Sequence, residues 1–99
     1  RVITISSIYG KEKGSNPYFT AAKAAQIAFM KSLAGNTDGT TFNTICPGHI
    51  DVGKEISDDV DTIGKPEDVA NLVVFLCSNL AQHINGACIT IDGGESHSF

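Results

Sequence analysis

Several features that would place a protein in a broad functional class are missing from this sequence. No apolar run approaches the roughly 20 residues that a membrane-spanning helix needs. The chain has a net charge of −4 and no cluster of lysine and arginine, which argues against nucleic-acid binding, because clustered basic side chains bind phosphates. It also has no internal repeat and no low-complexity tract. The remaining composition, 41% hydrophobic and 18% charged over 99 residues, is that of one small soluble globular domain.

Potential metal ligands are few and scattered. The three cysteines and three histidines are Cys46, Cys77, Cys88, His49, His83 and His97. Their spacing fits no zinc pattern, so we expect no metal site. Each cysteine lies in an apolar stretch, which favours buried, reduced thiols and a cytoplasmic protein. A reactive thiol at Cys46 is the alternative to a core thiol there.

The chain begins at Arg1 within a strand-like pattern, without an initiating methionine, a signal peptide or a linker. Natural domains rarely open in the middle of a strand. We therefore interpret Arg1 as a cut end, with the preceding half of the domain absent.

Apolar patterning predicts five elements in the order strand, helix, strand, helix, strand. They lie at 2–6, from Pro17 to Leu33, at 41–46, from near Pro66 to 76, and at 87–91. Strands alternating with crossover helices indicate a parallel sheet with helices on both faces. The fold class is therefore α/β, as the C-terminal half of a Rossmann-type doubly wound parallel sheet. Its first strand would present an unpaired edge.

Local signals support both helices. Pro17 suits a first helical turn, and Gly35 with Asn36 ends the first helix. Pro66 opens the second helix, with acidic residues where the helix dipole favours them. The stretch at 69–76 is apolar nearly all round, which predicts that it is well buried.

Five motifs in order carry a family resemblance: ISS at 5–7, FTAAK at 19–23, NTICPGHI at 43–50, GKPEDVA at 64–70, and ING at 84–86 leading to IDGG at 91–94. In this order and spacing, they resemble the short-chain dehydrogenase/reductase family over essentially all 99 residues. The resemblance implies that the chain is the C-terminal part of a single Rossmann domain, residues 1–99, whose dinucleotide-binding half lies before Arg1.

The resemblance implies roles for particular residues. Ser7 matches the serine that hydrogen-bonds the substrate oxygen, and Lys23 matches the lysine that binds the nicotinamide ribose. The backbone of Pro47, Gly48 and Ile50 matches the stretch that docks the nicotinamide carboxamide. Val52 stands where the family commonly has a threonine near the pyrophosphate, so that hydrogen bond is expected to be missing. The implied cofactor is NAD or NADP, in a form that this sequence does not select.

One position departs from the family pattern. The family's catalytic tyrosine lies four residues before the lysine, and that position here is Phe19. Residues four apart share a helix face, whereas Tyr18 and Lys23 would lie about 140° apart. Tyr18 therefore replaces the tyrosine only if the helix start shifts. Losing a general acid typically slows a reaction by about 10²–10⁴-fold. An engineered Tyr-to-Phe substitution is a further explanation.

These observations leave more than one function open. The first is an NAD(P)-dependent oxidoreductase acting on a small carbonyl or alcohol, with the isolated 99-residue chain inactive and binding cofactor weakly at best. The alternatives are a non-catalytic cofactor- or partner-binding relative, acting as a sensor or scaffold, and an inactive gene remnant. The resemblance also implies a homo-oligomer through the alanine-rich helix at 17–34.

Two further predictions concern the surroundings of the site. His49 flanks the expected nicotinamide position and is a candidate for contact with substrate. The stretch between Ile50 and Gly64 has few apolar residues and predicts a solvated acidic surface, which disfavours a bulky apolar substrate. Its acidic residues are Asp51, Glu55, Asp58, Asp59 and Asp61.

Overall fold

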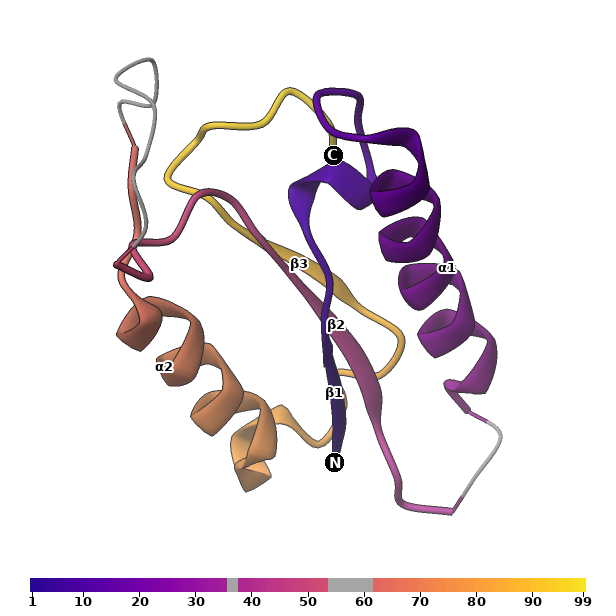
Figure 1. Cartoon of the computed structure of the whole chain (residues 1–99). Coiled ribbons are helices and arrows are strands. Elements are labelled where there is room, and N and C mark those ends of the chain that lie inside the picture. The colour runs from indigo at the N-terminus through magenta and orange to yellow at the C-terminus, as the bar shows by residue number, and fades with distance from the viewer. Residues whose placement is uncertain (36–37, 54–61) are drawn as a thin grey trace.

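The sheet has three parallel strands and a helix on either face (Figure 1). The structure, a computed structural model, describes residues 1–35, 38–53 and 62–99. In chain order the elements are β1 (Val2–Ile5), the short 3₁₀ helix η1 (Ile8–Gly10), α1 (Pro17–Leu33), β2 (Phe42–Pro47), α2 (Pro66–Cys77), a second 3₁₀ turn η2 (Asn79–Ala81) and β3 (Cys88–Ile91). The predicted α/β class and the strand–helix alternation are confirmed.

Strand β2 is the central strand, and it pairs in parallel with β1 on one side and β3 on the other. Val2 pairs with Phe42, and Thr44 pairs with Cys88. Within the described residues β1 pairs only with β2, so the predicted unpaired edge is present. The five residues of β2 before Pro47 are all buried, as a central strand covered on both faces requires.

Both helices begin where the sequence signals place them. Asn16 caps α1 by accepting a hydrogen bond from the Tyr18 amide at 2.8 Å, and Pro17 occupies the first turn. Gly35 follows the helix with a φ of 83°, a conformation that glycine adopts freely. The other proposed terminator, Asn36, lies outside the described residues. In α2, the Asp68 side chain accepts from the Lys65 amide at 2.8 Å.

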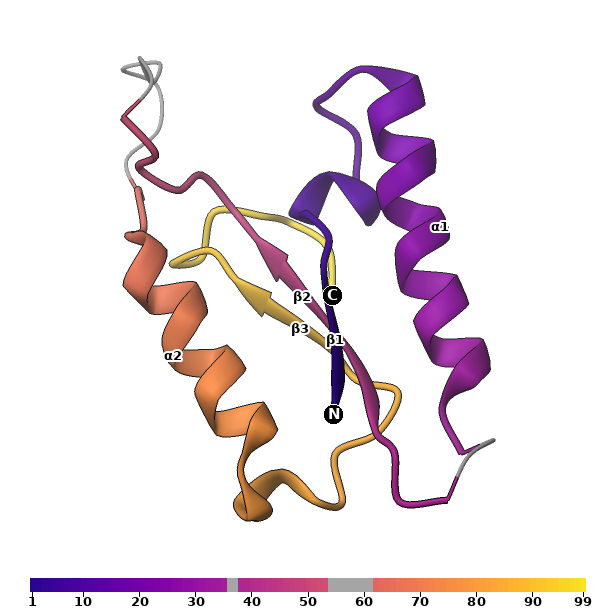
Figure 2. The ribbon, with the colours of Figure 1, turned by 60° about the horizontal axis from the view of Figure 1, so that its bottom comes forward.

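The two helices cover opposite faces of the sheet, as both views show (Figures 1 and 2). On the α2 face, Ile45, Leu76 and Ala81 form the core, with partly buried apolar side chains packed around them. The prediction that α2 is well buried is wrong for part of its surface: Val74 is 70% exposed and Phe75 41% exposed. The helix packs one face on the sheet, and no described segment covers the other. None of the helices in the described ranges is long and apolar enough to cross a membrane.

The buried polar side chain of Asn43 in β2 holds a neighbouring segment of the chain by hydrogen bonds. Asn43 is 1% exposed; its amide nitrogen donates to the Ile84 carbonyl, and its carbonyl oxygen accepts from the Ala87 amide, both at 2.9 Å. These two bonds fix the segment that leads into β3. The C-terminal residues then cross beyond the strand ends and reach the region of η1 (Figure 1).

Candidate active site

The candidate residues gather at the carboxyl ends of the strands, the edge at which open α/β sheets bind ligands. At the end of β1, the buried Ser6 donates its hydroxyl to the Lys23 carbonyl at 2.8 Å and so ties α1 to the strand. Ser7, half-buried, begins η1, and its hydroxyl oxygen accepts from the Tyr9 amide at 3.1 Å. The Ser7 hydroxyl proton is therefore available to a second partner.

Lys23 contacts Phe19 and not Tyr18. Its ammonium lies 5.5 Å from the centroid of the Phe19 ring and 3.5 Å from the Ile5 carbonyl oxygen. Phe19 and Lys23 thus share a helix face, as their spacing predicts. The Tyr18 side chain is 87% exposed, and the helix starts at Pro17 without a shift. The geometry therefore offers no support for Tyr18 as the replacement tyrosine.

The segment after β2 is held by the neighbouring loops. Gly48 donates its amide to the Ile91 carbonyl at 2.9 Å, and a side chain at Gly48 would collide with Asp92. Further along, Ile50 forms a parallel bridge with Gly64. Val52 is 63% exposed and, as an apolar side chain, offers no hydrogen bond. Of the predicted acidic stretch, Asp51 is exposed, and Glu55, Asp58, Asp59 and Asp61 lie outside the described residues.

The bridge at Ile50 leaves that residue's own backbone groups free. The His49 carbonyl accepts from the Gly64 amide, and the Asp51 amide donates to the Gly64 carbonyl, both at 2.9 Å. In a parallel bridge the flanking groups bond to the partner, while the central residue's N–H and C=O point the other way. Accordingly, the Ile50 N–H and C=O make no hydrogen bond to any residue in the described ranges.

A carboxylate–imidazole pair stands beside this segment. Glu95 Oε2 lies 2.6 Å from His49 Nδ1, and Glu95 Oε1 accepts from the His49 backbone amide at 3.0 Å. The Tyr9 ring packs against the His49 ring at 84°, with the ring centroids 6.1 Å apart. Burial raises the pKa of the Tyr9 hydroxyl above its usual range, and the nearby negative charges of Glu95 and Glu12 raise it further.

The sequence indicated His49, but its partners Tyr9 and Glu95 were not predicted. One relationship offered a clue. Loops that follow neighbouring parallel strands are adjacent in space, and Glu95 follows β3 just as His49 follows β2. Neither loop on its own contains a pattern that indicates the pair.

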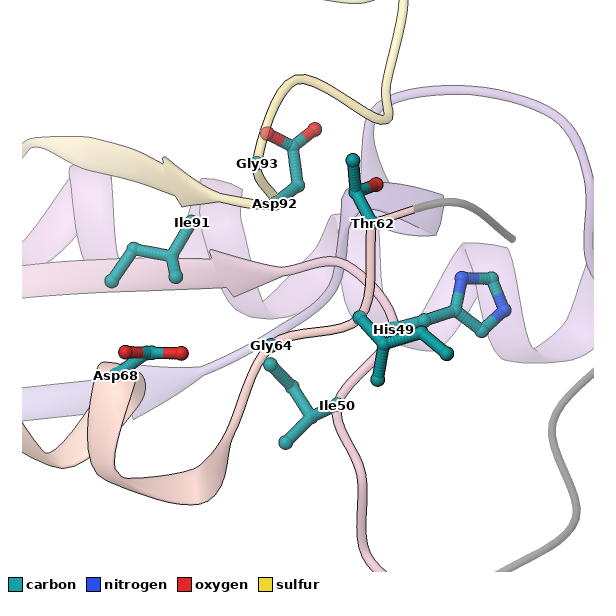
Figure 3. A pocket seen from close by; sticks show the side chains of 9 residues that line it. His49, Ile50, Thr62, Gly64, Asp68, Ile91, Asp92 and Gly93 are labelled. Atoms are coloured by element: carbon teal, nitrogen blue, oxygen red, sulfur yellow. The ribbon is translucent and has the colours of Figure 1, made fainter.

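A pocket of about 310 Å³ opens on the α2 side of this edge (Figure 3). Its lining includes His49, Ile50, Gly64, Asp68, Ile91 and Asp92. Neither Ser7 nor Lys23 lines it, so this hollow is not where the candidate catalytic side chains meet. In the described part of the chain, no three metal-binding side chains are grouped closely enough to hold an ion.

The cysteines are not all buried, contrary to the expectation. Cys46 is buried, whereas Cys77 and Cys88 are exposed. The Cys46 and Cys88 sulfurs lie 3.3 Å apart across β2 and β3. Burial, together with the Cys88 neighbour, raises the pKa of the Cys46 thiol to about 12. This thiol stays protonated at neutral pH, which argues against the reactive-thiol alternative.

Comparison with known proteins gives concordant matches. The model of the family described as enoyl-(acyl carrier protein) reductase matches residues 1–96. An acetoacetyl-CoA reductase of Shinella zoogloeoides is 35% identical over 111 aligned residues, covering 96% of this chain and 46% of that protein. The crystal structure of a short chain dehydrogenase from Bacillus anthracis superposes with a TM-score of 0.82 at 36% identity, covering 98% of this chain and 43% of that one.

A second solved structure carries a cofactor. A 3-oxoacyl-[acyl-carrier protein] reductase with bound NAD from Brucella melitensis superposes with a TM-score of 0.84 at 26% identity, over 93% of this chain and 39% of that one. The chain thus spans about half the length of the curated relatives that it matches.

Proposed function

This chain belongs to the short-chain dehydrogenase/reductase family, and we propose that it serves an NAD(P)-dependent oxidoreductase acting on a small carbonyl or alcohol. The observation that carries the proposal is that Ser7 follows the end of β1 while the Lys23 ammonium reaches the Ile5 carbonyl at that same strand end. Both match the family motif, and both lie at the sheet edge that binds ligands in this architecture.

The residues present suit the nicotinamide end of a dinucleotide. The unpaired N–H and C=O of Ile50 are one donor and one acceptor, which is the complement of a primary carboxamide. The Lys23 ammonium has three donors and, among the described residues, one long hydrogen bond, to the Ile5 carbonyl, so donors remain for ribose hydroxyls. Pro47 and Gly48 hold this backbone stretch in place. When bound, the cofactor would supply or accept the hydride.

The chain's own side chains have separate parts in this proposal. Because the Ser7 oxygen already accepts from the Tyr9 amide, its hydroxyl donates to the substrate oxygen and orients it. Lys23 binds the ribose and places positive charge beside the reacting groups. The Phe19 side chain has no ionisable proton and can only pack against Lys23. This favours a second candidate function, cofactor binding without turnover.

The proposal extends to the setting of the protein. We place it in the cytoplasm, and we expect a homo-oligomer through the helix at 17–34. Phe29, on α1, is 64% exposed, and small alanine side chains on the same helix are also exposed, a surface suited to helix packing between subunits.

The test uses the complete gene product that contains these residues. Calorimetric titration with NADH and NADPH should show binding that Lys23→Met weakens at least tenfold. Lys31→Met, a change to an exposed lysine on the same helix, is the matched control and should leave binding unchanged. Turnover would then be measured with acetoacetyl-CoA, the compound in the name of the Shinella relative, and with a short ketone. Binding without turnover supports the non-catalytic function, and equal effects of the two lysine variants would contradict the assignment of Lys23.

A further inference from the structure

The oxidoreductase proposed above needs a proton donor, and the position of the family tyrosine does not provide one. Phe19 has no ionisable group, and Tyr18 points into solvent at 87% exposure. Tyr9 is close to Ser7, but its pKa is raised, which moves it further from the neutral range where acid–base groups work best. The Cys46 thiol is buried and holds its proton. These candidates therefore do not replace the tyrosine.

His49 is the remaining ionisable side chain at this edge with a suitable arrangement. Its ring is fixed at Nδ1 by Glu95 and held from the side by the Tyr9 ring. Nε2, on the opposite side of the ring, makes no hydrogen bond to any described residue, and the side chain is 35% exposed. In Figure 3 the ring points away from Ile50 and Asp68.

The Glu95 contact does more than anchor the loop. Its Oε1 already binds the His49 backbone amide, which is enough to hold the C-terminal segment to this loop. The second oxygen binds the ring itself, which fixes the Nδ1–H tautomer and leaves Nε2 as the open nitrogen. A carboxylate that orients an imidazole, with the far nitrogen left open, is the arrangement of a general acid–base group.

We infer that His49, oriented by Glu95, is the catalytic acid–base residue that exchanges the proton with substrate in place of the missing tyrosine. This inference rests on the proposed function. Tyr9 links Ser7 to His49: its backbone amide donates to the Ser7 hydroxyl oxygen, and its ring contacts the His49 ring. The proposal requires that a carbonyl held by the Ser7 hydroxyl be placed on the open side of the imidazole.

The reduction is balanced with one hydride and one proton. When bound, reduced nicotinamide would supply a hydride with its electron pair to the carbonyl carbon; a C–H bond would form, and the π electrons of the C=O bond would move onto oxygen. The oxygen takes the proton from Nε2 of the His49 imidazolium, forming the alcohol. His49 is left neutral with Nδ1–H still donated to Glu95, and solvent returns the proton to the exposed ring. Alcohol oxidation runs the same steps backwards.

The test is a rescue experiment in the complete gene product. His49→Gln should lower kcat for carbonyl reduction by about 10²–10⁴-fold. His83→Gln, a change to an exposed histidine after η2, is the matched control and should leave kcat unchanged. The double variant His49→Gln with Phe19→Tyr should recover most of the loss, because a tyrosine beside Lys23 can then donate the proton. A purely structural His49 would not be rescued from a position on another element.

A second readout is independent of turnover. Imidazole ¹⁵N NMR should show neutral His49 as the Nδ1–H tautomer, and Glu95→Gln should abolish that preference. Unchanged kcat in His49→Gln, lack of rescue by Phe19→Tyr, or an Nε2–H tautomer would each overturn the inference. If turnover appears only in the Phe19→Tyr variant, the inferred role of His49 is wrong, but the proposed oxidoreductase function is supported. No turnover with or without Tyr at position 19 overturns the proposed activity and the role of His49 together.

Discussion

The Lys23 ammonium lies over the face of the Phe19 ring, 5.5 Å from its centroid and one helical turn away. This contact places an aromatic ring beside the lysine where the family has its tyrosine. The helix geometry of that pair is therefore kept although the hydroxyl is absent.

Phe19→Tyr should be accepted without loss of stability. The ring is 42% exposed, so an added hydroxyl can reach solvent, and the contact with Lys23 is retained. We expect the free energy of unfolding to change by less than about 0.5 kcal/mol, as for most surface substitutions. Denaturant unfolding of both proteins measures it. A loss well above 1 kcal/mol would show that the site excludes a tyrosine and would complicate the rescue experiment.

Gly48→Ala should destabilise the loop between β2 and Ile50. An added methyl group would lie 2.8 Å from both Asp92 Cβ and Glu95 Oε1, and 3.2 Å from the Asp92 backbone. Overpacking of this kind typically costs about 1–3 kcal/mol. Gly39→Ala is the comparison, because Gly39 has open space but a φ of 70°, so it tests backbone strain alone. The NMR signals of the His49 ring should move only in the Gly48 variant.

Asn43→Ala should be among the most destabilising polar substitutions in the chain. It would leave the Ala87 amide and the Ile84 carbonyl without their partners in a buried place, at about 1–3 kcal/mol for each. The matched control is Asn85→Ala. Asn85 also accepts from a backbone amide, that of Phe42, but its side chain is exposed, so water can substitute, and about 1 kcal/mol is expected. Equal losses in chemical denaturation would contradict this account.

The C-terminal segment should loosen in acid before the sheet does. Hydrogen bonds from Ser96 and from the Gly94 amide lower the pKa of Asp92 despite its partial burial. Burial acts to raise the pKa of Glu12, but the hydrogen bonds from His97 and Ser98 outweigh it and lower that pKa. A carboxylate whose pKa is lower in the folded state stabilises the fold at pH values above its unfolded-state pKa, which is near 4. That stabilisation is lost as the pH falls through the folded-state pKa.

Hydrogen exchange checks this directly. Amide protection at Ser96 and Ser98 should fall between pH 6 and pH 3, after correction for intrinsic rates, while protection at Ile45 in β2 persists. Asp92→Asn should weaken protection at Ser96 already at pH 6. Parallel loss at Ile45 would mean that the whole sheet, and not the terminal segment, responds to acid.

The sequence predicted the elements well because their signals are local. Asn16, Pro17 and Gly35 act within one turn of the helix ends, and the structure places α1 between them. The order of strands and crossover helices then restricts the topology, because parallel strands need long connections. The register of Val2 with Phe42 needed the structure.

The wrong or missing predictions concern the burial of helix and strand surfaces and the contacts between residues of different loops. The apolar sequence of α2 does not indicate whether another segment covers its outer face, and in this structure Val74 on that face is exposed to solvent. Likewise, an apolar neighbourhood in sequence did not bury Cys88, which lies on a strand with one neighbour. The pairing of His49 with Glu95 joins two loops far apart in the chain, and no periodic pattern encodes such a contact.

The parallel order of the sheet also shapes how the chain folds. Val2 can meet Phe42 only after α1 has been traversed, and Thr44 can meet Cys88 only after α2. None of the strand pairs in the described residues can start from a tight hairpin, so the entropy of closing each long crossover is lost before the first ladder bond forms. Folding should accordingly be slow for a chain of this length. During synthesis β2, whose residues before Pro47 are all buried in the fold, emerges after β1 and before β3, and it is the segment that a chaperone would have most reason to protect.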